Sequence, residues 1–212
     1  MTIIQIPIGP LQTNCYILGC EETGKAAVID PAWDGRFLAQ TLREQKLTLT
    51  HILITHSHFD HVGGLAELKE ATGVPVYIHP EAVAMLAYAT ASAAHWQIDM
   101  PQPPPADLML TPGEAIRVGK LKLDVLFTPG HAPGHVSFYL AEEGVLFDGD
   151  TLYKQSIGRT DLPGGDMPLL MQSIRQQLLT LPDDTHVLSG HGEATTIGYE
   201  KAHNPFLTND WG

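Results

Sequence analysis

The chain has 212 residues, enough to bury a sizeable hydrophobic core, and one domain over residues 1–212 is expected. Its hydrophobic content of 43% and charged content of 17% are those of a globular protein. The formal net charge of −12, without any run of basic residues, argues against nucleic acid or an anionic membrane as a partner. The N-terminus lacks the basic segment of a signal peptide, and no apolar run reaches membrane-spanning length. A cytoplasmic enzyme is therefore expected, and Cys15 and Cys20 are expected to be free thiols.

Strands and helices alternate in the first half of the chain. Short apolar runs bounded by turn residues predict strands over residues 2–6, 15–19, 26–30, 50–55 and 74–79. Asp34 is expected to cap a helix whose apolar face comprises Phe37, Leu38, Thr41 and Leu42. Two further helices are predicted, one over residues 65–72 and one that Pro80 opens at its first position.

The second half contains more strands. Apolar residues alternate over 121–127, which predicts a half-buried strand after a turn at residues 119–120. A hairpin is predicted from residues 136–141 and 144–149, and a last strand from residues 185–190. Between them, apolar side chains at 170, 174, 178 and 181 predict an amphipathic helix. No linker-like stretch separates the two halves.

Residues 89–112 differ from the rest of the chain because they are rich in Ala and Pro. The PQPPP run at 101–105 is incompatible with regular structure, so a long loop is expected. Long loops in compact domains are often functional. We expect either a flap beside the active site, with Trp96 or Met100 contacting substrate, or a plain surface connector.

The stretch THSHFDHVGG (55–64) holds three of the chain's eleven histidines and an aspartate within six positions. Alternate residues of an extended backbone point the same way, so His56, His58 and Asp60 are expected to converge at the end of a strand. His61 is expected to aim at a neighbouring point. Imidazole and carboxylate groups are ligands of zinc and related divalent ions, so the motif predicts a metal site.

Three later segments repeat the pattern of a strand that runs into glycine and then a ligand-type side chain. They supply His131 in FTPGHAPGH, Asp150 in LFDGDT and His191 in VLSGHGE. Seven ligands are too many for one tetrahedral ion, but they suit two ions that share a carboxylate. His135 and Asp148, which lie near these ligands in the sequence, are expected to be structural, with a supporting role at the site as the alternative for His135.

The order HSHFDH, PGH, GDT and GHG resembles that of the metallo-β-lactamase superfamily over nearly the whole chain. This resemblance implies an α/β fold, a four-layer αβ/βα sandwich with the metals at one edge of two packed sheets. It also implies how the metals are held: His56, His58 and His131 bind one ion, Asp60, His61 and His191 bind the other, and Asp150 bridges them.

Two divalent cations held by these ligands would make a water molecule acidic enough to give a hydroxide nucleophile at neutral pH. They would also polarise the attacked carbonyl. Asp60 could orient that nucleophile and is the expected catalytic residue. Zinc is expected first, with iron or manganese as alternatives. Because a thiolate leaves more readily than an alkoxide, and no general acid is evident in the sequence, a small-molecule thioester is the expected substrate.

The segments GDTLYKQSIGRTDLPGGD (149–166) and GHGEATTIGYEKAHNPFL (190–207) resemble the short bacterial form of type II glyoxalases, the hydroxyacylglutathione hydrolases. That resemblance implies hydrolysis of S-D-lactoylglutathione to D-lactate and glutathione. The C-terminal helical domain that grips glutathione in the long form is not expected here. Arg159 would be a substrate-binding residue for a glutathione carboxylate, the alternative being an ion pair with Asp161 or Asp166; Lys154 is a weaker candidate.

Other activities on the same scaffold remain open. A persulfide dioxygenase would use a single iron held by residues of the His56, His131 and Asp150 type. A lactonase or other ester hydrolase is a second alternative, and a metal-binding protein without catalysis a third. A conventional β-lactamase is disfavoured, because that group lacks a bridging aspartate at the position of Asp150.

Overall fold

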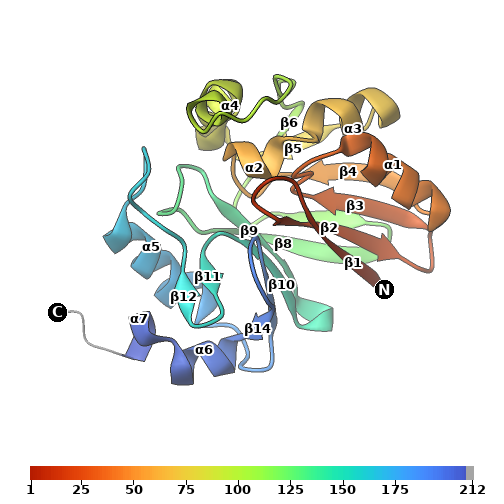
Figure 1. The fold of residues 1–212 in the computed structure, drawn as a ribbon. Helices are drawn as coiled ribbons and strands as arrows, with labels where there is room; N and C mark the ends of the chain where they lie inside the picture. Colours follow the sequence, from red (N-terminus) through yellow and green to blue (C-terminus); the bar gives the residue numbers. More distant parts are fainter. Residues whose placement is uncertain (209–212) are drawn as a thin grey trace.

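The computed structural model describes residues 1–208 as two packed β-sheets with helices on both outer faces (Figure 1). The first sheet has the strand order β1-β2-β3-β4-β5-β6. Its strands are β1 (Thr2–Ile8), β2 (Thr13–Cys20), β3 (Lys25–Ile29), β4 (Thr48–Leu53), β5 (Val76–Ile78) and β6 (Leu108–Met109). The first three strands pair antiparallel, and β3 to β6 pair parallel. The parallel part follows from the helices that connect its strands.

The second sheet has the order β14-β13-β10-β9-β8-β7. Its strands are β7 (Ala115–Val118), β8 (Leu121–Phe127), β9 (Val136–Leu140), β10 (Val145–Gly149), β13 (His186–Ser189) and β14 (Thr195–Thr196). Only β10 and β13 pair parallel; the other pairs are antiparallel. A small hairpin, β11 (Leu152–Tyr153) and β12 (Ser156–Ile157), leaves the end of β10.

Three hydrophobic clusters hold these layers together. The inner cluster, with Leu18, Phe138 and Phe147 among its members, fills the space between the sheets. A second cluster joins the first sheet to α1 (Gly35–Glu44), α2 (Phe59–Val62), α3 (Leu65–Thr72) and α4 (Val83–His95). A third joins the second sheet to α5 (Met167–Ser173) and α6 (Ile197–His203); α7 (Pro205–Thr208) follows. The layer order is helix, sheet, sheet, helix, which confirms the αβ/βα sandwich.

Most elements lie where the periodicity predicts them, with two exceptions. Asp34 caps α1 as expected, since its side chain accepts the Phe37 N–H, but Phe37 is 45% exposed and the buried face carries Ala39 beside Leu38 and Leu42. The predicted helix over residues 168–181 is α5 followed by a π-helical stretch, Ile174–Leu178.

The prediction of a long loop over residues 89–112 is wrong at its start. Helix α4 continues to His95, because the alanines that made the segment look unusual are also strong helix formers. Met100 is only 4% exposed and belongs to the core beneath α4, so it does not reach into a flap. Trp96, at the end of α4, is 53% exposed.

Both cysteines are free and buried, as expected. Within residues 1–208 no helix combines the length and apolar character needed to cross a membrane.

Candidate metal centre

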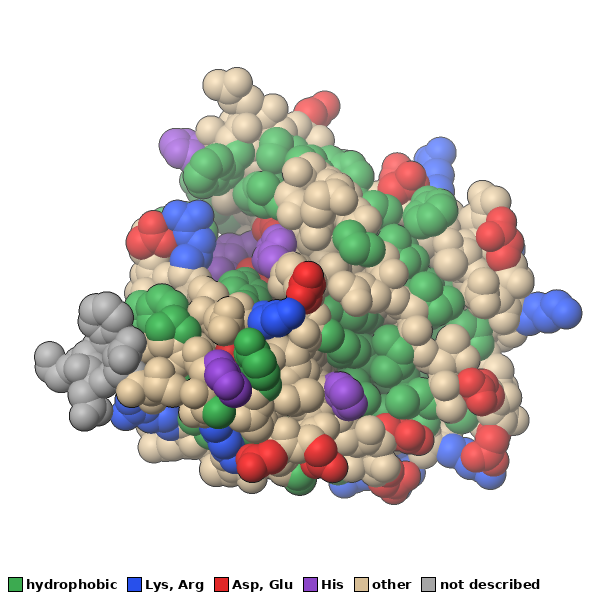
Figure 2. Space-filling view, turned by 60° about the horizontal axis from the view of Figure 1, so that its bottom comes forward, with side chains coloured by type: hydrophobic (Ala, Val, Ile, Leu, Met, Phe, Trp, Pro, Cys, Tyr) green, Lys and Arg blue, Asp and Glu red, His purple; other side chains and the backbone are tan. Residues whose placement is uncertain are grey.

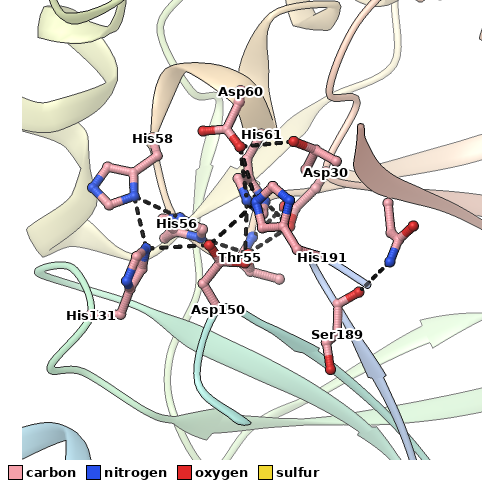
Figure 3. A network of polar contacts seen from close by, with 12 residues as sticks. Asp30, Thr55, His56, His58, Asp60, His61, His131, Asp150, Ser189 and His191 are labelled. Atoms are coloured by element: carbon pink, nitrogen blue, oxygen red, sulfur yellow. Dashed lines mark hydrogen bonds and ion pairs between the residues drawn. The ribbon is translucent and has the colours of Figure 1, made fainter. Parts of the chain in front are cut away.

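The carboxyl ends of β4, β8, β10 and β13 point to one edge of the sandwich. Strands β10 and β13 run parallel and end in register at Gly149 and Ser189, and the Gly190 N–H donates to the Gly149 carbonyl at 2.7 Å. At the same edge the Val136 N–H donates to the Thr55 carbonyl at 2.9 Å, which ties the end of β4 to the start of β9 in the other sheet. The residues that follow these strands therefore meet at one place (Figure 3).

Three histidines form the first cluster at this edge. His58 Nδ1 lies 3.1 Å from His56 Nε2 and 2.8 Å from His131 Nε2. His56 and His58 follow β4 in the first sheet, and His131 follows β8 in the second. One ligand nitrogen from each of the three lies within 4.8 Å of the others, close enough for all three to hold one ion.

Asp60, His61 and His191 form the second cluster. His191 Nε2 lies 3.2 Å from Asp60 Oδ2, and His61 Nε2 lies 3.6 Å from the same oxygen. One ligand atom from each of these three residues also lies within 4.8 Å of the others, close enough for all three to hold one ion. The two clusters are those that the family resemblance implies.

The Asp150 carboxylate lies between the two clusters (Figure 3). Its Oδ2 lies 3.4 Å from His131 Nε2, in the first cluster, and 3.6 Å from His191 Nε2, in the second. Its Oδ1 lies 3.4 Å from His61 Nε2. The structure thus brings together all seven predicted ligands, with the aspartate in the position of a bridge.

The donor set fits a pair of divalent cations. His61 Nε2 and Asp150 Oδ1 are buried without any hydrogen-bond partner, although buried polar atoms are nearly always paired. An imidazole nitrogen and a carboxylate oxygen that face one another in a buried site are typical of ligands for a shared cation. Oxygen and nitrogen donors without thiolate suit zinc, iron or manganese.

The route by which Asp60 reaches the site differs from the prediction. His58 does lie on extended backbone, but a helical turn, α2, begins at Phe59, whose side chain enters the hydrophobic core. Asp60 therefore does not share the direction of His56 and His58. The turn directs it, with His61, toward the second cluster.

Asp30 is a buried residue of the site that the sequence reasoning missed. Its carboxylate accepts hydrogen bonds from the Thr55 N–H at 2.7 Å, the Thr55 hydroxyl at 2.6 Å and His61 Nδ1 at 2.9 Å. The hydroxyl of Thr55 in turn accepts from His56 Nδ1 at 3.0 Å. These contacts leave Nε2 of both histidines free to bind metal, the usual arrangement around a metal-bound imidazole. Asp30 directly follows β3, just as the metal ligands follow their strands. The same pattern, a polar side chain at the end of a strand, could therefore have identified it.

Two more hydrogen bonds orient the ligands. His131 Nδ1 donates to the Arg159 carbonyl at 2.7 Å, which leaves its Nε2 for a metal. The Thr13 hydroxyl, at the start of β2, donates to Asp60 Oδ2 at 2.8 Å. Neither contact is visible in the sequence, because each joins segments far apart along the chain.

Only glycine fits at position 190, between β13 and His191. A Cβ atom there would lie 2.2 Å from Asp150 Oδ1 and 2.7 Å from His61 Cε1. The chain is held in this position from the first sheet, since the Tyr16 hydroxyl donates to the Ser189 carbonyl at 2.7 Å. The backbone therefore forms one wall of the candidate centre.

Without metal, the histidines of the first cluster are neutral at pH 7. Burial lowers the pKa of His58 to about 4, and the neighbouring imidazole of His131 adds to the effect. Burial also lowers the pKa of His56 well below its usual value and, against the pull of Asp150, lowers that of His131. Neutral imidazole is the form that binds metal.

The second cluster and the bridge hold charge. Burial disfavours the charged form of His61, but Asp150 and Asp60 outweigh it and raise the His61 pKa well above its usual value. Burial acts against both carboxylates as well, yet the adjacent histidines lower the pKa of Asp60 to about 2 and that of Asp150 well below its usual value. Both aspartates are therefore anionic at neutral pH, as metal ligands must be.

Tyr153 is a second site residue that the sequence reasoning missed. It lies in β11, three residues after Asp150, and burial together with the nearby Asp150 charge raises the pKa of its hydroxyl well above the usual value. Its ring meets the His191 ring edge-on, with centroids 6.3 Å apart. The sequence shows no evident general acid, and Tyr153 is a tyrosine beside the centre that the sequence did not indicate.

Two exposed ion pairs come from segments next to the ligands. Arg159 makes a two-point contact with Asp161, at 2.7 and 2.8 Å, and Lys154 contacts Glu193 at 2.5 Å. In Figure 2, histidine side chains lie in a hollow of this face, with basic and acidic side chains around it. The ion pair with Asp161 is the alternative considered for Arg159, whose role in substrate binding remains a prediction.

The sequence matches the family model of the metallo-β-lactamase superfamily over residues 8–191. The chain belongs to this superfamily. Among its relatives is a probable metallo-hydrolase, YqgX, of Bacillus subtilis, 40% identical over 205 residues that cover 96% of each chain. The hydroxyacylglutathione hydrolase GloC of Haemophilus influenzae is 38% identical over 215 residues, which cover 99% of each chain. Relatives that are named as hydrolases thus match the chain over nearly its whole length.

Solved structures agree with the fold. A B3 metallo-β-lactamase, BLEG-1, superposes with a TM-score of 0.91 at 43% identity, covering 98% of this chain and 100% of the other. TTHA1623, solved in a di-iron-bound form, gives a TM-score of 0.89 at 41% identity, covering 96% of this chain and 100% of the other.

Proposed function

We propose that this metallo-β-lactamase superfamily protein is a dinuclear hydrolase that cleaves a glutathione thioester such as S-D-lactoylglutathione, giving D-lactate and glutathione. The observation that carries the proposal is the position of Asp150, whose two oxygens face both ligand clusters. One carboxylate that reaches two groups of ligands is the arrangement expected for two metal ions rather than one. The di-iron form of TTHA1623 supports the same count of metals.

Two bound cations would supply a nucleophilic hydroxide at neutral pH and would polarise the substrate carbonyl. The chain's own side chains would orient the attacking water. Asp60 is anionic, and its Oδ2 already accepts from Thr13, so its remaining lone pairs can accept a hydrogen bond from the attacking water. We therefore propose Asp60 as the catalytic residue that aims the nucleophile, with Thr13 holding the carboxylate in place.

The leaving group favours a thioester. A thiol has a pKa of about 8.5, so it departs as the thiolate without a proton donor, whereas an alkoxide leaving group needs a proton donor. The relative from Haemophilus influenzae is named a hydroxyacylglutathione hydrolase, and the chain spans 99% of it. This match over nearly the whole of the relative supports glutathione thioester hydrolysis. Zinc is the metal we propose, and iron is the alternative that the di-iron relative favours.

Recognition of glutathione is proposed to involve Arg159. Its guanidinium is exposed and paired with Asp161, and exposed ion pairs contribute little stability, so a substrate carboxylate could displace the aspartate. The backbone carbonyl of the same residue accepts a hydrogen bond from His131 Nδ1, so Arg159 lies next to a ligand of the first cluster. This proximity supports a role at the mouth of the centre.

The test is steady-state hydrolysis by protein whose metal content has been measured. S-D-lactoylglutathione would be compared with a lactone, a phosphodiester and a β-lactam, the last because BLEG-1 is described as a β-lactamase. We expect the thioester to give the highest kcat/KM and two metal ions per chain. A single iron per chain, with oxygen consumption in the presence of glutathione persulfide, would replace the proposal with a persulfide dioxygenase.

Tyr153 favours a second candidate function, the hydrolysis of a lactone or another oxygen ester. Its ring packs against His191, and the Asp150 charge helps to raise the pKa of its hydroxyl, which stays protonated and could donate a hydrogen bond to a departing alkoxide. The comparison of parent protein with Tyr153→Phe separates the two functions. An ester hydrolase would lose activity on oxygen esters more than tenfold, whereas hydrolysis of the thioester would change little.

A further inference from the structure

His135 is fully buried directly behind the candidate metal centre, and the proposed reaction gives it no role. Its Nε2 accepts the backbone N–H of Asp150 at 3.0 Å. Its ring stacks on the ring of His56, with centroids 4.9 Å apart and planes 29° apart. The His135 side chain thus contacts both His56, a ligand of the first cluster, and Asp150, which lies between the two clusters.

The other nitrogen of His135 begins a buried chain of hydrogen bonds. Since Nε2 accepts a hydrogen bond from the backbone, Nδ1 carries the ring proton and donates to Thr128 Oγ1 at 2.9 Å. Thr128 Oγ1 lies 2.9 Å from Ser137 Oγ, which donates to Asp148 Oδ1 at 2.9 Å. The other Asp148 oxygen accepts the Leu152 N–H at 2.6 Å.

This chain of side chains closes around the loop that carries the bridge. One end holds the backbone at Asp150 and the other end holds it at Leu152, two residues later. The loop has little freedom on its inner side, because a Cβ atom at Gly149 would lie 2.7 Å from His135 Nε2. A fully paired buried network of this kind fixes geometry, whereas apolar packing alone would allow the loop to shift.

We propose that His135 is a positioning residue of the metal centre, which holds the Asp150 carboxylate at a set distance from His56 so that both ions are retained. Thr128, Ser137 and Asp148 keep its ring in the required tautomer and orientation. This inference rests on the proposed dinuclear site. A residue with only a packing role would lower stability when replaced, but it would not lower metal affinity selectively.

The test measures metal rather than turnover. His135→Met keeps a similar volume but removes the acceptor, while His135→Gln offers an amide oxygen near the position of Nε2. Thr128→Val breaks the chain one step behind the ring and touches no ligand. Thr185→Val is the matched control, because the buried Thr185 hydroxyl has no hydrogen-bond partner. Each purified protein is loaded with zinc, equilibrated with increasing chelator, and analysed for metal per chain.

We expect His135→Met and Thr128→Val to weaken zinc retention by about 10- to 100-fold, the usual effect of removing a residue that orients metal ligands. His135→Gln should recover part of that loss, and Thr185→Val should behave like the parent protein. KM for S-D-lactoylglutathione should stay near the parent value in the fraction that keeps both ions.

Equal zinc retention in His135→Met, Thr128→Val and the parent overturns the positioning role, as does an equal loss in Thr128→Val and Thr185→Val. If His135→Met does not fold, Thr128→Val decides the question, with the melting temperature of its metal-free form compared with that of Thr185→Val. A parent protein that binds no metal contradicts the proposed function itself. A parent that binds two ions as firmly as every variant contradicts only the inference about His135.

Discussion

Three of the five histidines of the candidate centre are oriented by a neighbour that binds the nitrogen on the far side of the ring. Nδ1 of His61, His56 and His131 donates a hydrogen bond to Asp30, to Thr55 and to the Arg159 carbonyl, respectively. Nε2 of these rings is therefore the nitrogen that faces the site. At the scale of single residues, the centre depends on these partners as much as on the ligands.

The clearest residue-level prediction concerns Asp150. Replacing it by Asn keeps the shape but removes the charge shared by both clusters, so we expect fewer than two ions per chain and a loss of kcat of more than about 100-fold. Metal analysis and steady-state kinetics on the same sample provide the measurement. Asp124→Asn, at a surface ion pair with Lys122, is the control and should leave both quantities unchanged.

A second prediction follows from the lowered pKa of His58 in metal-free protein. Its pKa is about 4 when folded, so between pH 6.5 and 4 the unfolded chain binds a proton that the folded chain excludes. Stability is therefore complete above pH 6.5 and falls as the pH drops toward 4. Between pH 7.5 and pH 5 the parent should lose about 2 kcal/mol more than His58→Gln in urea unfolding. An equal loss in the two proteins would refute the shift; the exposed His186→Gln should follow the parent.

Arg159 and Asp161 give a paired prediction about substrate binding. Arg159→Ala should raise KM for a glutathione thioester several-fold and change kcat less, because it removes a contact made equally in ground and transition states. Asp161→Asn releases the guanidinium from its two-point contact and should lower KM or leave it unchanged. If Arg159→Ala leaves KM unaltered, the side chain is only a surface ion pair.

At the scale of elements, the site depends on strands that end at the same edge. The parallel pair β10 and β13 brings Asp150 and His191 side by side, and the link from β4 to β9 brings the ligands of the first sheet to meet them. Glycines at these ends allow the backbone to pass close to the ligands.

Gly190→Ala tests this geometry. The added methyl group would occupy space 2.2 Å from Asp150 Oδ1, so we expect loss of bound metal with the overall fold retained. Gly192→Ala is the matched control two residues away. A Cβ there meets nothing within 4 Å, although its positive φ of 74° should cost about 1 kcal/mol of stability. Metal content and melting temperature together separate loss of metal from loss of stability. Full metal occupancy in Gly190→Ala would contradict the close approach of the backbone to the centre at position 190.

At the scale of the whole molecule, the centre joins the two halves of the sandwich. Four ligands come from residues 56–61 in the first half, and the other three come from the second half, after β8, β10 and β13. Bound metal would thus stabilise contacts between the sheets, in addition to the apolar cluster that fills the space between them.

Removal of metal should therefore lower the melting temperature. Ions present at about 100 times their dissociation constant contribute about 2.7 kcal/mol, which corresponds to roughly 5–10 °C for a chain of this size. The measurement is a thermal melt before and after chelation, with recovery on addition of zinc. Asp150→Asn should show a smaller change than the parent, and an identical change in both would mean that the stabilising ions bind elsewhere.

The sequence by itself determined the seven candidate ligands, the family resemblance and most of the strands. It could do so because ligand types, glycines at strand ends and apolar periodicity are local properties of the chain. Which ligands share a cluster was only implied by the resemblance, and the extended-strand argument misplaced Asp60, since a helical turn begins at Phe59.

Only the tertiary structure decided the roles of Asp30, Thr13, Tyr153 and His135. Each acts through a contact with a group distant in sequence or on the far side of a turn, and no local pattern reports such a contact. It also showed that α4 continues through the alanine-rich segment and that Met100 belongs to the core. The ligands can be read from the chain because their chemistry is their own, whereas the residues that orient them are defined by where the fold puts them.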